Sequence, residues 1–146
     1  MSTLPERFSE HLASVTAEQW QSLFMLLPDL RTAKSHGELL FPKSNEANVV
    51  TLPGWIHGKG LSRVVDVFYG LNLIVKFDWS NWEEGSLLLN NPETGFNSFD
   101  AFTLCKLLTA AIRADRFHDG FLVRVFESGN GVKILEALKT KIAANQ

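Results

Sequence analysis

The sequence predicts one mostly α-helical domain, and three observations support this prediction. The chain has 146 residues, the size of a single ordinary domain. Hydrophobic residues make up 45% of it and include 11 Phe and 4 Trp, so a hydrophobic core can form. Along most of the chain these residues recur three and four positions apart, which is the period of an amphipathic helix. We therefore expect an all-α bundle of about seven helices, with a minor β-hairpin over residues 39–52 as its one addition.

Capping motifs predict two helices at the start of the chain. Thr3 and Glu6 have the spacing of a capping box, in which each side chain bonds the backbone of the other residue. Thr16 and Gln19 repeat this motif further along. The second helix should end near Pro28, because proline interrupts the hydrogen bonds of a helix.

The helical pattern is lost over residues 36–60. This stretch contains two of the five prolines and four of the ten glycines, which are typical of turns. Leu39–Phe41 and Asn48–Leu52 have the composition of short strands. We expect a long ordered loop here, in which these two segments form the minor hairpin.

Helical spacing resumes at Leu61. The helices expected beyond it cover residues 61–70, 79–90 (capped by Asp78), 99–116, 121–127 and 132–142. The helix over 99–116, with Asn97 or Ser98 as its cap, carries the widest apolar stripe. The single domain of residues 1–146 thus consists of N-terminal helices (1–35), a long loop (36–60) and a helical core (61–146).

Charge and cysteine content exclude several classes of function. The net charge of −2 gives no general attraction to nucleic acid or anionic lipid. The lone cysteine, Cys105, excludes an intramolecular disulfide and a cysteine-based zinc site, and its apolar helix favours core packing over a nucleophilic role. The four histidines lack the spacing of metal ligands, so we expect no metal and no other cofactor. The chain shows no signal-peptide pattern and no membrane-length apolar run, which predicts a cytoplasmic protein without a membrane partner.

The loop Gly54–Gly60 is the first candidate binding site. It lacks the spacing of a Walker loop, and no clear strand precedes it as a dinucleotide-binding turn would require. Trp55, His57 and Lys59 lie close together on this loop and can bind a planar or anionic ligand. The alternative is a tight turn before the next helix, in which the glycines adopt positive φ.

A charged cluster at the end of the long apolar helix is the second candidate. It consists of Arg113, Asp115, Arg116 and Asp119, and His118 lies within it as a further candidate binding residue. In the structural explanation the arginines offset the helix dipole, and Asp115 or Asp119 caps a helix or pairs with Arg116. In the functional explanation the planar guanidinium groups bind a carboxylate, a phosphate or an acidic residue of a partner. His118 and Asp119 are adjacent, so their side chains diverge and do not predict a metal site.

Trp79 and Trp82 form the third candidate. Three residues apart, they share one face of the expected helix, and both can enter the core. If they are exposed, they form a recognition patch, because aromatic anchors dominate protein interfaces.

Two blocks of sequence carry a resemblance to a known family. The first is Phe77-Asp78-Trp79 followed by Trp82, and the second, more specific block runs from Leu107 to Phe117 and is followed by Gly120. Together they resemble an uncharacterised bacterial family, a domain of unknown function, over the stretch from Leu61 to Leu138. The resemblance implies a bacterial, plasmid or phage origin without an assigned activity, and it leaves the first sixty residues outside the match.

Three functions fit these features. The first is a non-enzymatic module that binds and regulates a protein, by analogy a host defence component, because no acid–base pair, metal cluster or phosphate loop stands out. The second is nucleic-acid binding through the C-terminal helices, since residues 101–146 carry a net charge of +3 against −5 for residues 1–100. The third is a small-molecule or enzymatic site lined by Trp55, His57, Trp79, Arg113 and Arg116. The charge split is also compatible with a homo-oligomer.

Overall fold

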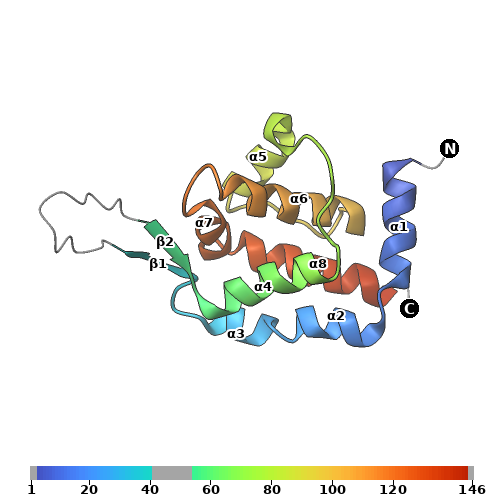
Figure 1. The fold of residues 1–146 in the computed structure, drawn as a ribbon, viewed down its shortest axis with the longest axis horizontal. Coiled ribbons are helices and arrows are strands. Elements are labelled where there is room, and N and C mark those ends of the chain that lie inside the picture. The colour runs from blue at the N-terminus through green and yellow to red at the C-terminus, as the bar shows by residue number, and fades with distance from the viewer. Residues whose placement is uncertain (1–2, 41–53, 145–146) are drawn as a thin grey trace, which may run out of the picture.

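Helices make up most of residues 3–40 and 54–144, the part of the chain that the computed structural model describes (Figure 1). In chain order the elements are α1 (Leu4–Ser14), α2 (Ala17–Phe24), α3 (Leu27–Thr32), β1 (Gly37–Leu40), β2 (Gly54–His57), α4 (Lys59–Gly70), the 3-10 helix η1 (Trp79–Asn81), α5 (Glu83–Asn90), α6 (Ala101–Ala114), α7 (Phe121–Glu127) and α8 (Asn130–Ala144). The prediction of a mostly α-helical fold with a small hairpin is confirmed.

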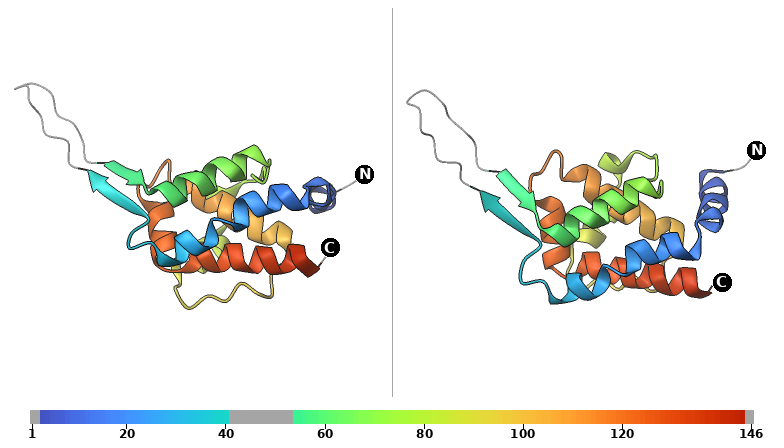
Figure 2. Two further views of the ribbon diagram at one scale, coloured as in Figure 1. Left: turned by 90° about the horizontal axis from the view of Figure 1, so that it is seen from below. Right: turned by 60° about the horizontal axis from the view of Figure 1, so that its bottom comes forward.

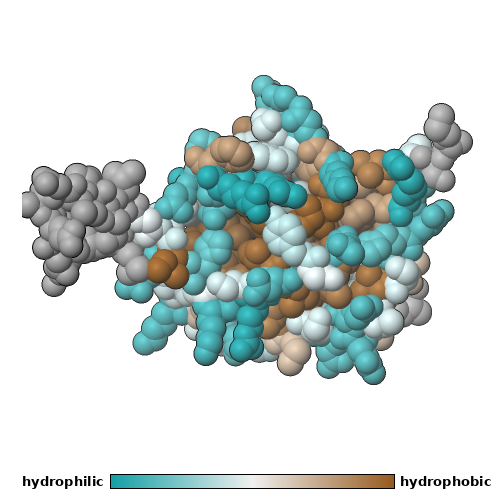
Figure 3. Space-filling model, in the orientation of Figure 1, coloured by the Kyte–Doolittle hydropathy of each residue, from teal (hydrophilic) through white to brown (hydrophobic). Residues whose placement is uncertain are grey.

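The core lies between α6 and α8, which pack more extensively on each other than any other two helices described. Helix α7 closes one end of this pair, while η1 and α5 cover α6, and α3 packs on α8 (Figures 1 and 2). The residues at the centre are fully buried and come from both helices: Leu104, Leu107, Leu108, Ala111, Ile134, Leu135 and Leu138. In the view of Figure 3, hydrophobic atoms are visible mainly in the furrows between the helices. Among the described residues, no helix is long and apolar enough to cross a membrane.

The N-terminal capping boxes form as predicted. The Glu6 amide donates to Thr3 Oγ1 over 3.2 Å and the Gln19 amide donates to Thr16 Oγ1 over 3.1 Å, with both return bonds present. The predicted helix end at Pro28 is wrong. Helix α2 ends at Phe24, and Pro28 lies in the first turn of α3, where its missing N–H costs no hydrogen bond.

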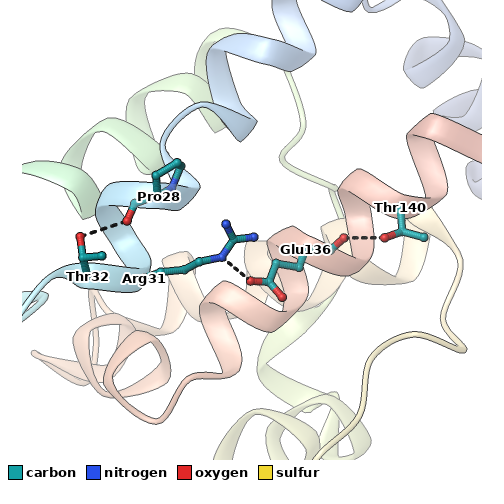
Figure 4. A network of polar contacts seen from close by, with 5 residues as sticks. All are labelled: Pro28, Arg31, Thr32, Glu136 and Thr140. Atoms are coloured by element: carbon teal, nitrogen blue, oxygen red, sulfur yellow. Dashed lines mark hydrogen bonds and ion pairs between the residues drawn. The ribbon is translucent and has the colours of Figure 1, made fainter.

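An ion pair ties α3 to α8. Arg31 Nε donates to Glu136 Oε1 over 2.7 Å (Figure 4). Next to this pair, the Thr32 hydroxyl donates to Pro28 O in α3 and the Thr140 hydroxyl donates to Glu136 O in α8. Both side chains of the pair are nearly half exposed, at 49% and 44%, so the pair contributes less than about 1 kcal/mol. Burial of the apolar side chains therefore dominates the packing of α3 on α8.

The hairpin projects from one end of the helical body (Figures 1 and 2). Its strands are antiparallel, with Gly37 opposite His57 and Leu40 opposite Gly54. The first strand overlaps the predicted Leu39–Phe41. The second predicted strand, Asn48–Leu52, lies outside the described residues. The observed second strand is Gly54–His57, so the expectation of a tight glycine turn over Gly54–Gly60 is wrong.

Two helix starts differ from the predictions. The helix expected from Trp79 is split into η1 and α5, and the carboxylate of Asp78 caps no helix but accepts bonds from Ser80 Oγ and Asn81 Nδ2. Helix α6 begins at Ala101, where Asp100 accepts a bond from the Thr103 amide over 2.8 Å. The cap is therefore Asp100 rather than Asn97 or Ser98.

Candidate functional site at the α6–α7 turn

Asp115 links three elements at the C-terminal end of α6. Its Oδ1 accepts a bond from the Leu122 amide over 3.0 Å and so caps the start of α7. Its Oδ2 lies 2.9 Å from Nε2 of His57 on β2. The Asp115 side chain is only 14% exposed and that of His57 is 26% exposed, so both bonds are shielded from water. Asp115 thus caps a helix, as expected, but among the described residues the side chain that it contacts is His57 and not Arg116.

Asp119 and Gly120 hold the same strand at a second point. Asp119 Oδ2 accepts a bond from the Trp55 amide over 2.9 Å. Gly120 has a φ of +87°, and a Cβ added to it would lie 2.5 Å from Trp55 Nε1. The turn therefore needs glycine both for its left-handed conformation and for the close approach of the indole ring. We call residues 115–120 the α6–α7 turn. Asp115 and Asp119, on one side of this turn, hold strand β2 of the hairpin.

The other side of the turn is exposed. Phe117 is 74% exposed, and its ring centroid lies 5.8 Å from that of Trp79. Beside this pair is a groove of about 250 Å³, which we call the Trp79 groove. Among the residues that line it are Trp79, Trp82, Glu83, Ala114, His118 and Phe121. The structure thus brings Trp79, Trp82 and His118, three of the predicted site residues, to one surface.

Trp82 forms a wall of this groove and is held by a cation. The ammonium group of Lys106 lies 4.4 Å from the Trp82 ring centroid and 4.8 Å from that of Phe77. The Phe77 and Trp82 rings themselves pack edge to face at 5.4 Å. Trp79 instead has the Phe117 ring as its aromatic neighbour, with the two ring centroids 5.8 Å apart. Both tryptophans pack against the core and remain half-buried.

The five residues of the predicted small-molecule pocket are divided among different surroundings. His57 lines a hollow with Glu38, and Trp79 lines the Trp79 groove. The Arg113 guanidinium lies 5.7 Å from the Tyr69 ring centroid, and Arg116 is exposed. Trp55 lies against Gly120 and Asp119 at the α6–α7 turn. Lys59, which belongs to the loop candidate and not to this pocket, lines a third hollow at the start of α4.

The basic residues of the C-terminal helices have separate local contacts. Lys133 Nζ donates to Pro92 O over 2.9 Å, and the Arg124 guanidinium lies 5.7 Å from the Phe121 ring centroid. Lys139 lines a hollow between α2 and α8. Because these cations are engaged at different places, they give little support to a continuous surface for nucleic acid.

The two side chains that could act as nucleophiles, Cys105 and Ser35, are buried in the core and hydrogen-bonded, respectively. Cys105 is fully buried, and desolvation together with Asp100 raises the pKa of its thiol, so it packs in the core as predicted. Ser35 lines the same hollow as His57, but its hydroxyl has Gly37 O at 2.5 Å and Glu127 Oε1 at 3.2 Å as acceptors. Within residues 3–40 and 54–144, no three acidic, histidine or cysteine side chains cluster as metal ligands.

Two contributors to this surface were absent from the sequence predictions. Phe117 carries a signal that could have found it, because it is a large apolar residue between charged residues just beyond the predicted helix over 99–116. Lys106 carries no such signal, since its aromatic neighbours Phe77 and Trp82 lie far from it in sequence.

Comparison with models of protein families gives a match that covers most of the chain. A model for a family of unknown function, DUF6508, matches residues 15–144. The match begins well before Leu61, so it includes α2, α3 and the strands of the hairpin as well as the helical core. No curated protein and no solved structure matches the chain. Since the matched residues make up most of its length, the chain belongs to the DUF6508 family of unknown function.

Proposed function

We propose that the chain is a non-enzymatic protein-binding module of bacterial, plasmid or phage origin, which holds its partner in the Trp79 groove. The observation that carries this proposal is Phe117, a large aromatic residue that is 74% exposed and whose ring lies 5.8 Å from that of Trp79, a lining residue of the groove. It sits on a turn that the bonds of Asp115 and Asp119 fix in place. An exposed aromatic side chain on a rigid support is typical of an interface anchor, because little entropy is lost when it is buried.

The charges beside the groove support a partner of a particular chemistry. Glu83 lines the groove, and Asp78 and Glu84 are exposed close to it in sequence. Hydrogen bonds from Asn81 and then Ser80 lower the pKa of Asp78, so this carboxylate is charged at neutral pH. A partner segment with an apolar side chain next to lysine or arginine fits both features. The apolar group would occupy the groove and the cation would meet the carboxylates.

Regulation of a host defence component is the specific role that we favour for this binding. It rests on analogy with other small proteins of phages and plasmids. The burial of Cys105 and the hydrogen bonding of Ser35 support the non-enzymatic part of the proposal, since neither side chain is an activated nucleophile.

The test is an affinity capture from lysate of the native host with tagged wild type, Phe117→Ala and Leu87→Ala, analysed by mass spectrometry. Leu87 is the matched control, because it is also 74% exposed but, unlike Phe117, makes no aromatic contact with Trp79 of the groove. We expect a stoichiometric protein that wild type and Leu87→Ala retain and Phe117→Ala loses. Equal capture by all three variants would contradict the proposed site. An eluate with a high ratio of absorbance at 260 to 280 nm would instead support nucleic-acid binding.

A further inference from the structure

A second groove lies between α2 and α8, which run side by side (Figure 2). Residues of α2 and α3 line it on one side and residues of α8 on the other. Its volume of about 450 Å³ lies within the range of about 300–1,000 Å³ that is typical of sites for small molecules. We call it the α2–α8 groove, and it shares no lining residue with the Trp79 groove.

The floor of the α2–α8 groove is apolar. Its lining residues recur three and four positions apart along each helix: Ala17, Trp20, Gln21 and Phe24 on α2, and Lys139, Ile142 and Ala143 on α8. Each set therefore lies on one face of its helix. Trp20 and Ile142 are only 3% and 9% exposed, and the Trp20 and Phe24 rings stack with their centroids 5.6 Å apart. Met25 adds a flexible side chain that is 64% exposed, so the groove offers an adaptable apolar surface.

Two cations line this groove, and no aspartate or glutamate is among its described lining residues. Arg31 donates to Glu136 through Nε, so the two NH₂ groups of its guanidinium have no acceptor among the residues described (Figure 4). Lys139 has no carboxylate within 4.0 Å in the described part of the chain. Even with Glu136 included, two cations face one carboxylate. The charges are thus complementary to an anion, and the free edge of the guanidinium matches the two oxygens of a carboxylate.

The groove is charged at one end and apolar at the other. Along α8, Glu136, Lys139 and Ile142 follow one another at intervals of about one helical turn, and Arg31 pairs with the first of them. The cations therefore lie toward one end of the groove and Ile142 toward the other. A further hollow of about 410 Å³ also has Trp20 and Ile142 among its lining residues, together with apolar side chains of α1 and α6. This hollow adjoins the groove at the end away from the cations.

We propose that the α2–α8 groove binds a small molecule with a carboxylate head and an apolar chain, of the class of medium-chain fatty acids. The head pairs with Arg31 and Lys139, and the chain lies on Trp20, Phe24 and Ile142. The position of the cations at one end fixes the direction of the chain, which points toward the adjoining hollow. The site is independent of the Trp79 groove.

An NMR titration with sodium octanoate, against sodium chloride of equal ionic strength, tests the proposal. We expect saturable shifts at the indole N–H of Trp20 and at the methyl group of Met25, because both residues line the groove.

Variants of the cations test the head. Arg31→Gln/Lys139→Gln should bind octanoate at least about 10-fold more weakly than wild type, because charge-assisted hydrogen bonds are lost. Arg7→Gln/Lys76→Gln is the matched control, since it removes two exposed cations elsewhere and should bind like wild type. Wild type should bind neutral 1-octanol more weakly than octanoate, and the first double variant should lose this preference.

A variant that fills the groove tests the position of the chain. Ala143→Phe should weaken the binding of octanoate and of octanol, because Ala143 lines the groove and is exposed, so that the larger side chain is tolerated. Ala144→Phe is the matched control. Ala144 is also exposed, but it is not among the lining residues, and its substitution should weaken neither ligand.

Three results would overturn the proposal: no saturable binding of octanoate by wild type, equal weakening in both double variants, or equal affinity of wild type for octanoate and octanol. Binding of an acidic amphipathic peptide in the groove without binding of octanoate would also overturn it, and would assign the groove to a protein segment. Octanoate binding that Phe117→Ala retains would support the site whether or not the Trp79 groove binds a protein.

Discussion

On the side of the α6–α7 turn that faces the hairpin, Asp115 and Asp119 accept bonds from residues 58 and 64 positions away in sequence. On the side that faces η1, Phe117 is 74% exposed and contacts the half-buried Trp79. The two sides alternate along a stretch of six residues. The sequence of the turn has the same mixed, charged composition on both sides. What distinguishes the two sides is therefore the set of residues that each side chain contacts in the folded chain.

This contrast separates stability from binding. Substitutions on the hairpin side should unfold the turn or release β2, whereas substitutions on the groove side should leave the fold intact. The following predictions test that division in order of their expected effect on stability.

Gly120→Ala should have the largest effect. It places a side chain at a φ of +87° and drives its Cβ to within 2.5 Å of Trp55 Nε1, so we expect a loss of about 2–4 kcal/mol in the free energy of unfolding. Gly129→Ala is the control, because Gly129 has a φ of +92° with no atom within 4 Å of an added Cβ. Urea denaturation measures both. Equal losses would show that the contact with Trp55 contributes nothing.

Asp115→Ala should cost about 1–2 kcal/mol, since α7 loses its cap and His57 loses its partner. A double-mutant cycle with His57→Ala should give a coupling energy of at least about 0.5 kcal/mol. Additive effects would mean that the bond between the two side chains is not formed in solution.

Acidification should destabilise the base of the hairpin through His36. Desolvation lowers the pKa of this imidazole in the folded chain, with Glu127 opposing, so the unfolded chain binds more protons below pH 6.5. The free energy of unfolding should therefore fall as the pH drops from 7.5 toward 5.5, and it should fall less in His36→Gln. A steeper fall in the variant than in wild type would refute the assignment.

Phe117→Ala should change the free energy of unfolding by less than about 0.5 kcal/mol, as is usual for an exposed side chain. Its affinity for the partner should nevertheless fall by about 10-fold or more. Thermal unfolding of Phe117→Ala beside Leu87→Ala checks the first part, and titration with the captured partner checks the second.

Local signals in the sequence predicted much of the helical fold. The capping boxes at Thr3 and Thr16 form because their partners lie three residues away. The apolar stripe of α6 is buried because its period matches the helix. Pro28 was misread because proline is acceptable in the first turn of a helix as well as just after its end, and sequence alone did not decide between the two.

The hairpin and the candidate site were less predictable because they depend on distant residues. Trp55 and His57 belong to a strand that pairs with β1, and Asp119 and Asp115 contact this strand from across the fold. The sequence singled out Trp79, Trp82 and His118, which do share a groove, but it did not indicate that Phe117 contacts Trp79 there. The contact between the Lys106 ammonium group and the Trp82 ring is likewise a product of the fold that the sequence does not indicate.

The most direct test of the division within the turn is one preparation of Phe117→Ala measured for both unfolding and capture. The account predicts a free energy of unfolding within about 0.5 kcal/mol of wild type together with loss of the partner that Leu87→Ala retains. A loss in the free energy of unfolding above about 1.5 kcal/mol would contradict the account, because Phe117 would then belong to the structural side of the turn. Undiminished capture of the partner would also contradict it, because Phe117 would then belong to no binding surface.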